Sequence, residues 1–260
     1  MMQPFLSRAE LLLGSEAMER IAHKRVILFG VGGVGSWCAE SLVRSGVMYL
    51  TIVDADRVSV TNINRQLMAT TLTVGQVKVE ALKERLHAIN PLAEITACEG
   101  VFSEDTVEDF RLEEYDYIID AIDSLKNKAL LIRRACMTQA CFFSSMGAAL
   151  KLDPTRIRVA EFWKVQGDPL ARALRNHFKR EKSLPRRKFQ CVYSDELLTN
   201  QGTASTEHES PALFHKPQLN GSLAHITAIF GFTLAGLVVQ DIMKDDCQAI
   251  VSEIHKNKQK

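Results

Sequence analysis

The feature that most constrains the fold is a glycine-rich turn. Residues 30–35 read Gly-Val-Gly-Gly-Val-Gly and directly follow the apolar run Arg25-Val-Ile-Leu-Phe29. This is a G-x-G-x-x-G turn between a strand and a helix, in which Gly30, Gly32 and Gly35 allow a tight turn, close approach of a phosphate and close helix–strand packing. With Gly33 beside them, they leave backbone N–H groups uncovered at a helix N-terminus, where an anion is stabilised. The turn alone predicts a bound nucleotide and does not identify the reaction.

The hydrophobic pattern after this turn predicts an α/β fold. Strands alternate with helical segments up to residue 145, which indicates a Rossmann-like, mostly parallel sheet with helices on both faces. Residues 157–162 alternate apolar and polar, which predicts an antiparallel extension in the C-terminal half. The expected strands are 25–29, 50–53, 94–97, 115–120 and 141–145, and the expected helices are 4–23, 34–45, 75–89, a segment ending near 137, and the first part of 169–188.

We expect one domain over 1–260, with a nucleotide-binding half (1–150) and a substrate half (151–260). The polar, turn-rich residues 199–217 predict a mobile loop, and residues 256–260 a frayed tail. Residues 217–240 contain no Asp, Glu, Lys or Arg. This apolar segment, a helix from about 221, is long enough to span a membrane, but its threonines and glycines favour a buried core or interface helix.

Composition narrows the function classes. The net charge of +1 shows no global bias toward nucleic acid, so such a partner needs a local basic patch. The six cysteines are scattered without a C-x-x-C pair, which argues against zinc and against a secreted disulfide framework. The N-terminus lacks a basic region followed by an apolar core, so we expect no signal peptide and a cytoplasmic protein.

Charged residues after the turn favour a triphosphate. Asp54 lies 19 residues beyond Gly35, at the end of the second predicted strand, where an acid accepts hydrogen bonds from a ribose. A NAD(P)-dependent oxidoreductase would share this acid but has little use for Arg65 and Lys78 as additional cations. Attack on an α-phosphate builds charge on the leaving pyrophosphate, and fixed cations stabilise that charge. Asp123, after the strand 115–120, is suited to Mg²⁺ held through phosphate oxygens.

Together these motifs resemble the E1-like superfamily, which includes ubiquitin-activating enzymes and the adenylyltransferases of sulfur carriers. The resemblance covers about residues 25–150 and implies ATP and Mg²⁺ as ligands. It assigns Asp54 to the ribose, Asn62, Arg65 and Lys78 to the phosphates, and Asp123 to Mg²⁺. It gives Arg8 the role of an arginine lent to the partner subunit's ATP, which implies a homodimer. The matching residues are Gly30, Gly32, Gly33, Gly35, Asp54, Asp56, Asn62, Arg65, Gln66, Lys78 and Asp123.

Motifs in the second half extend the resemblance. With them, nearly the whole chain resembles the tRNA threonylcarbamoyladenosine dehydratases. The similarity lies in Asp153-Pro-Thr-Arg-Ile-Arg-Val159, Asp168-Pro-Leu-Ala171, Cys191-Val-Tyr-Ser194 and Asn220-Gly-Ser-Leu-Ala-His225. It implies that ATP activates the carboxylate of the threonylcarbamoyl group on tRNA as an acyl-adenylate, and that a nitrogen of the same side chain then closes a ring.

Two points of this resemblance stay open. The alternative is activation of the C-terminus of a ubiquitin-like sulfur carrier, whose activators usually carry two zinc-binding C-x-x-C pairs. Related dehydratases also accept sulfur from a cysteine desulfurase system through a cysteine before the Asn-Gly-Ser run. Residues 213–217 contain no cysteine, so that role is not carried over. The sequence decides neither this partnership nor a requirement for a monovalent cation.

A basic stretch between residues 172 and 188 predicts tRNA binding. Eight cations and one acid give it the density of positive charge that suits a phosphate backbone, although a solvated charged helix has the same composition. His177, Phe178 and Phe189 are candidates for stacking on bases. Cys191 lies in a predicted strand and is expected to be a buried structural residue. The predicted tRNA-binding residues are Arg172, Arg175, Lys179, Arg180, Lys182, Arg186, Arg187 and Lys188.

Overall fold

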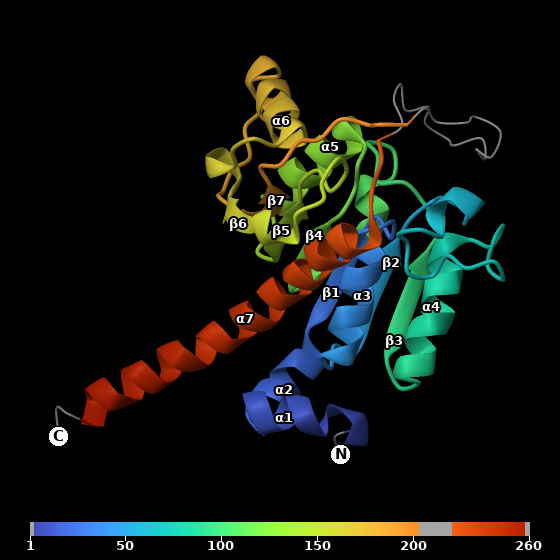
Figure 1. The fold of residues 1–260 in the computed structure, drawn as a ribbon. Helices are drawn as coiled ribbons and strands as arrows, with labels where there is room; N and C mark the ends of the chain where they lie inside the picture. The colour runs from blue at the N-terminus through green and yellow to red at the C-terminus, as the bar shows by residue number, and fades with distance from the viewer. Residues whose placement is uncertain (1–2, 203–219, 258–260) are drawn as a thin grey trace.

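The computed structural model describes residues 3–202 and 220–257, with side chains to Lys244. The described residues form a seven-stranded sheet in the order β3-β2-β1-β4-β5-β7-β6 (Figure 1). All neighbouring strands are parallel except β6, which runs antiparallel to β7. The predicted fold class is therefore confirmed. The strands are β1 Arg25–Phe29, β2 Tyr49–Val53, β3 Glu94–Cys98, β4 Tyr117–Asp120, β5 Cys141–Ser145, β6 Ile157–Glu161 and β7 Gln190–Ser194.

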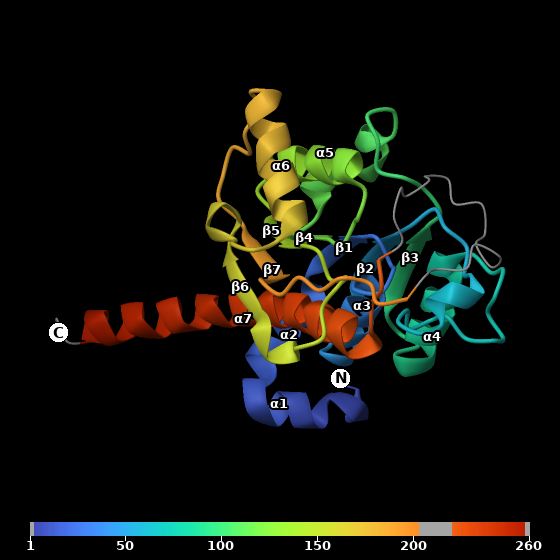
Figure 2. The same cartoon turned by 45° about the horizontal axis from the view of Figure 1, so that its top comes forward.

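Helices cover both faces of this sheet (Figures 1 and 2). Strand β1 shows why: Val26 and Leu28 belong to one hydrophobic core and Ile27 and Phe29 to the other. A parallel strand between two helical layers is buried on both faces, so it is apolar throughout rather than alternating. The α-helices are α1 Ser7–Leu13, α2 Ser15–His23, α3 Gly35–Arg44, α4 Lys78–Ile89, α5 Leu125–Ala135, α6 Pro169–Arg180 and α7 Ala224–Asn257. The short 3₁₀ helices are η1 Pro4–Leu6, η2 Val60–Asn62, η3 Val107–Phe110, η4 Leu112–Glu114, η5 Pro154–Arg156 and η6 Phe162–Lys164.

Several element boundaries differ from the sequence prediction. The helix expected over 4–23 is interrupted at Gly14, whose φ of 83° is incompatible with a continuous α-helix. The helix expected to begin at residue 75 begins at Lys78, because Val77 forms a β-bridge with Arg57. Helix α6 ends at Arg180, so the basic stretch continues as irregular chain. The prediction for 199–217 falls from residue 203 onward outside the described residues, as do residues 258–260 of the predicted tail.

Helix α7 contains the apolar segment whose composition is compatible with either a core helix or a membrane span. Its residues 224–244 have a mean hydropathy of 1.7 and are long enough to cross a membrane, and half of the apolar window is buried against the protein. Ile226, Phe230, Leu234 and Val238 are buried at a spacing of four, the pattern of a helix with one face on a core. A Cβ at Gly231 would lie 2.4 Å from the Val34 carbonyl oxygen, so α7 packs directly on the start of α3.

A salt-bridge cluster between α3 and α4 gives a pH-dependent test of the fold. Burial alone would raise the pKa of Glu40, but hydrogen bonds from Arg85 and Arg44 outweigh it and lower the pKa. The stabilisation is therefore fully present above the unfolded pKa, about 4.3, and is lost as pH falls through the folded pKa. We expect Glu40→Gln to lower the stability by about 1 kcal/mol at neutral pH. In thermal unfolding the two proteins should converge once the pH falls below the lowered folded pKa of Glu40; a difference that grows on acidification would contradict this.

Candidate functional site

The site lies where the direction of the chain across the sheet reverses. Strands β1 and β4 are neighbours, and the chain continues from β1 toward one edge of the sheet and from β4 toward the other. In open α/β sheets, ligands bind outside the carboxyl ends of the strands at this position. The glycine turn follows β1, and Ala121 to Asp123 follow β4, which ends at Asp120, so two predicted parts of the site lie side by side.

The glycines of the turn are explained by different structural features. Gly30 has a φ of 85°, and a Cβ there would lie 2.7 Å from the Ala121 carbonyl oxygen. A Cβ at Gly35 would lie 1.8 Å from the Gly30 carbonyl oxygen, and one at Gly33 would lie 3.0 Å from Cγ2 of Thr227 on α7. At Gly32 the nearest atom is Gln66 Nε2, 3.8 Å away. Gly30 and Gly35 therefore close the turn, while Gly32 leaves space in front of it.

Asp54 connects the turn to the end of β2. Its Oδ2 accepts a hydrogen bond from the Val31 N–H at 2.8 Å, and its Oδ1 accepts one from the Asp56 N–H at 2.9 Å. Burial raises the pKa of Asp54, and the positive charge of Lys78 partly offsets this rise. The carboxylate thus fixes the position of the turn, and a ribose would have to use its remaining lone pairs.

Lys78 is not a surface charge. Its side chain is 7% exposed at the start of α4, and its Nζ lies 2.8 Å from Oδ2 of Asp56. Asp56 is half exposed, so it can keep this ammonium in place from the solvent side. The structure therefore brings Asp54, Asp56 and Lys78 close together.

Three predicted residues lie on or just after η2. Oδ1 of Asn62 accepts the Ser59 N–H at 3.1 Å and so caps this helix. Nη1 of Arg65 donates to the Thr61 carbonyl oxygen at 2.8 Å. Gln66 is buried, and within the described residues its Oε1 has no hydrogen-bond partner. A buried acceptor beside Gly32 has an unmet hydrogen bond that a ligand's hydroxyl or bound water can supply.

A buried ion pair shapes the turn after β4. Oδ1 of Asp120 accepts the Ile122 N–H at 3.0 Å, and its Oδ2 lies 2.7 Å from Nζ of Lys128 on α5. Lys128 Nζ also donates to the Ile122 carbonyl oxygen at 3.0 Å, and both charged side chains are fully buried. Sequence analysis did not identify Lys128 or Ser144, whose Oγ donates to Asp120 Oδ2 at 2.6 Å. The available signal was a lysine within the apolar face of a predicted helix.

Asp123 and Arg65 interact electrostatically. Burial lowers the pKa of the Arg65 guanidinium, and the negative charge of Asp123 opposes this shift. Within the described residues, no three His, Cys, Asp or Glu side chains converge on a common point. Mg²⁺ is nevertheless commonly held by one or two carboxylates together with substrate phosphates, and Asp123 fits that mode.

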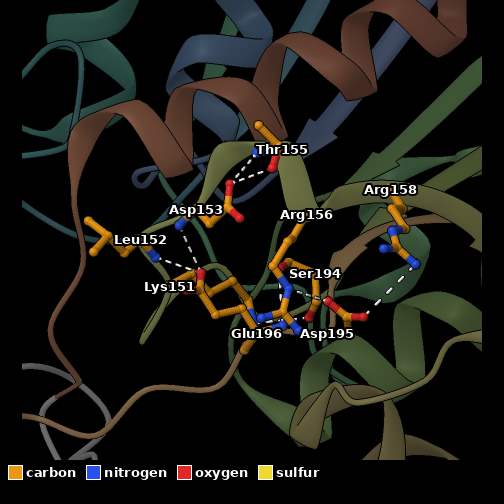
Figure 3. A network of polar contacts seen from close by, with 9 residues as sticks. All are labelled: Lys151, Leu152, Asp153, Thr155, Arg156, Arg158, Ser194, Asp195 and Glu196. Atoms are coloured by element: carbon orange, nitrogen blue, oxygen red, sulfur yellow. Dashed lines mark hydrogen bonds and ion pairs between the residues drawn. The ribbon is translucent and has the colours of Figure 1, made fainter.

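A second polar network borders the site on the β5 and β7 side (Figure 3). Nζ of Lys151 is buried and donates to the carbonyl oxygens of Ser194, at 3.1 Å, and of Glu196, at 2.6 Å. Burial lowers the pKa of Lys151. Oε2 of Glu196 accepts the Leu152 and Asp153 N–H groups. The segments that follow β5 and β7 are thereby joined beside the carboxyl ends of the strands, a connection that sequence analysis missed.

The basic stretch lies partly elsewhere. Arg187 donates to the carbonyl oxygens of Ala135, at the end of α5, and Ala140, just before β5. These carbonyls are at the amino end of the parallel strands, opposite the glycine turn. Phe178 and Phe189 are buried in the core, so their predicted role in base stacking is wrong. The exposed members of the stretch are Arg172, Lys179, Arg180, Lys182, Arg186 and Lys188, whereas Arg175 is partly covered and donates to the Phe162 carbonyl oxygen.

Two further residues that the sequence singled out are Arg8, which lies away from the glycine turn, and Cys191, which lies inside the sheet. Arg8 is exposed on α1, near the amino end of the sheet, where Leu6 packs against Gly46 ahead of β2. Cys191 is completely buried in β7 and burial raises its pKa, which confirms a structural cysteine. Hollows of about 530 and 600 Å³ lie beside α2 and α7, respectively.

The chain is similar to known proteins over most of its length. Residues 6–260 match the ThiF family. The chain is 38% identical to a tRNA threonylcarbamoyladenosine dehydratase of Bacillus subtilis (strain 168), over 92% of this chain and 94% of that one. It is 34% identical to the Escherichia coli (strain K12) protein of the same name, over 89% and 91%. A crystal structure of the Escherichia coli dehydratase in complex with ATP matches with a TM-score of 0.82 and 32% identity, over 94% and 95%.

Proposed function

We propose, from the premise that this chain belongs to the ThiF family, that it is an ATP-dependent tRNA threonylcarbamoyladenosine dehydratase. The observation that carries the proposal is the near full-length match to dehydratases of this name, one of them with ATP bound. The glycine turn, the buried Lys78 and the pair Arg65–Asp123 at the reversal point of the sheet support the same conclusion.

The reaction has two steps. An oxygen of the threonylcarbamoyl carboxylate attacks the α-phosphorus of ATP, and pyrophosphate leaves. A nitrogen of the same side chain then attacks the activated carbonyl carbon, losing its proton, and AMP leaves with the former carboxylate oxygen. The sum is removal of one water from the nucleoside while ATP becomes AMP and pyrophosphate.

The residues of the site would contribute mainly by positioning and charge. N–H groups of the turn 30–35 would bind phosphate oxygens, and Arg65 and Lys78 would stabilise the charge that develops on pyrophosphate. Asn62 and Gln66 line the same edge, and Asp54 and Asp56 hold the turn and Lys78 in place. Asp123 would hold Mg²⁺, which supplies charge neutralisation on the phosphates when bound. We also propose that the enzyme uses a monovalent cation, which is tested by measuring activity while the concentration of such a cation is varied.

The deciding experiment is mass spectrometry of nucleosides from tRNA that carries threonylcarbamoyladenosine. We expect a nucleoside lighter by one water after incubation with the protein, ATP and Mg²⁺, and none without ATP. If the nucleoside is unchanged and ATP–pyrophosphate exchange requires a ubiquitin-like sulfur carrier, the protein is a carrier-activating adenylyltransferase instead.

We propose that tRNA contacts the exposed cations of α6 and the chain after it. We expect the double variant Lys179→Glu/Arg180→Glu to raise the KM for tRNA at least tenfold, because reversed charges repel the phosphate backbone. The KM for ATP should stay within twofold. Kinetics at several salt concentrations measure this, with Lys83→Glu on α4 as a control. Equal effects of the double variant and of Lys83→Glu would assign tRNA binding to another surface.

Other assignments follow from family membership. We propose a homodimer, because the family resemblance gives Arg8 a role at ATP and Arg8 lies away from the glycine turn of its own chain, so it would reach ATP only in another copy. Sedimentation velocity measures this. Partnership with a cysteine desulfurase or sulfur-acceptor system stays a proposal, as does a cytoplasmic location, which suits an enzyme acting on tRNA.

A further inference from the structure

The buried ion pair between Asp120 and Lys128 carries a large desolvation cost. Both side chains are completely buried, and Nζ lies 2.7 Å from Oδ2. Removing two charges from water is costly, and well-packed apolar side chains of similar volume often fill such a space with equal or greater stability. The pair therefore calls for a role other than packing.

The pair holds one residue of the turn from both sides. Asp120 Oδ1 accepts the N–H of Ile122, and Lys128 Nζ donates to the carbonyl oxygen of the same residue, each at 3.0 Å. Ser144 Oγ donates to the other oxygen of Asp120 at 2.6 Å and fixes the orientation of the carboxylate. With both of its backbone polar groups bonded to buried partners, Ile122 has little freedom in φ or ψ.

The residue after Ile122 is Asp123. Its backbone begins at the carbonyl that Lys128 holds, so rotation of that peptide would change the direction of the Asp123 side chain. The turn is also fixed against the glycine turn: the Ala121 N–H donates to the Phe29 carbonyl oxygen at 2.8 Å, and the Ala121 carbonyl oxygen would lie 2.7 Å from a Cβ at Gly30. Asp120 and Lys128 thus hold the backbone from which Asp123 continues.

We propose that Asp120 and Lys128 are positioning residues that act through Asp123, by holding its carboxylate toward the metal ion on the bound triphosphate. The inference rests on the proposed function in giving Asp123 this ligand. Neither Asp120 nor Lys128 touches the substrate, because both side chains are fully covered by protein. Their loss is expected to impair metal binding and turnover more than nucleotide binding.

The test uses the double variant Asp120→Asn/Lys128→Met, which removes both charges at nearly constant volume. The introduced asparagine can still accept the Ile122 N–H, whereas the bond to the Ile122 carbonyl is lost. We expect kcat to fall about a hundredfold, the loss that a misplacement of about 1 Å can cause, and the KM for ATP to stay within threefold. Binding of Mn²⁺ to the complex with a nonhydrolysable ATP analogue, followed by electron paramagnetic resonance, should weaken about tenfold.

The matched control is Glu40→Gln/Arg85→Met, which removes an ion pair between α3 and α4 that does not contact the turn. It should leave kcat and Mn²⁺ affinity unchanged. The proposal is overturned if the two double variants give the same kcat and the same Mn²⁺ affinity. It is also overturned if the Asp120/Lys128 variant loses nucleotide and Mn²⁺ affinity in equal proportion, as general loosening of the fold would cause.

The metal measurement is independent of tRNA. If the wild-type protein fails to convert the modified nucleoside, the proposed function fails, while the Mn²⁺ titration still decides whether the buried pair positions Asp123. A variant that does not fold, seen by circular dichroism, is replaced by Lys128→Arg, which keeps the charge. The larger guanidinium displaces the bond to the Ile122 carbonyl oxygen, so weaker Mn²⁺ binding at unchanged nucleotide affinity supports positioning, and wild-type Mn²⁺ affinity counts against it.

Discussion

Replacing Asp123 by alanine is expected to lower kcat for cyclic nucleoside formation by at least about a thousandfold. The carboxylate is the proposed ligand of Mg²⁺, and it acts electrostatically on Arg65, which is otherwise destabilised by burial. Without this carboxylate, Mg²⁺ loses its proposed protein ligand and Arg65 loses a stabilising negative charge. Neither positive charge is then held in position to stabilise the leaving pyrophosphate. The measurement is single-turnover conversion of the modified tRNA at saturating ATP, with products separated as nucleosides.

The control for this substitution is Asp109→Ala, which removes an exposed carboxylate on η3. It should leave kcat within twofold of wild type. Nucleotide binding by Asp123→Ala should weaken much less than turnover, because the turn 30–35 keeps its N–H groups. If Asp123→Ala retains more than a tenth of the wild-type kcat, Asp123 does not have the proposed role in catalysis.

The nucleotide side of the site could be predicted from sequence because its requirements are local. The glycine turn depends on residues that are adjacent in the chain, and strand β1 before it is buried on both faces and therefore apolar. Asp54 and Asp123 lie just after β2 and β4, whereas Arg65 and Lys78 lie farther along the chain. Parallel strands bring their carboxyl ends to one edge, so the order of elements already predicts which side chains meet there.

The supporting contacts could not be predicted in the same way. Lys128 meets Asp120 only after α5 packs on the sheet, and Lys151 meets Ser194 and Glu196 only after β7 inserts beside β5. The position of Lys128 within the apolar face of a predicted helix is a signal of burial, but it does not identify the partner, because partners are decided by tertiary packing. The composition of the basic stretch likewise predicts that Arg187 belongs to a positively charged surface. In the structure, its guanidinium donates a hydrogen bond to a backbone carbonyl oxygen at the end of α5.

Gly35→Ala is expected to abolish ATP binding and to destabilise the fold, the second large effect. A Cβ at this position would lie 1.8 Å from the Gly30 carbonyl oxygen, a backbone atom that cannot rotate away. The first turn of α3 would have to separate from β1, which opens the turn 30–35, the proposed phosphate-binding element. We expect the Kd for ATP to rise at least a hundredfold, since the aligned N–H groups are lost. Overpacking should lower the stability by about 3 kcal/mol, or about 6 to 12 °C in Tm.

Gly236→Ala separates this steric effect from the chemical change of glycine to alanine. Nothing lies within 4 Å of a Cβ at Gly236, which is in the middle of α7. Alanine favours a helix over glycine by about 1 kcal/mol, so this variant should be as stable as wild type or more so and should bind ATP normally. Isothermal titration calorimetry and thermal unfolding of both variants make the comparison. If Gly35→Ala binds ATP as tightly as Gly236→Ala does, the turn 30–35 is not the phosphate-binding element, and the nucleotide must be held mainly by side chains.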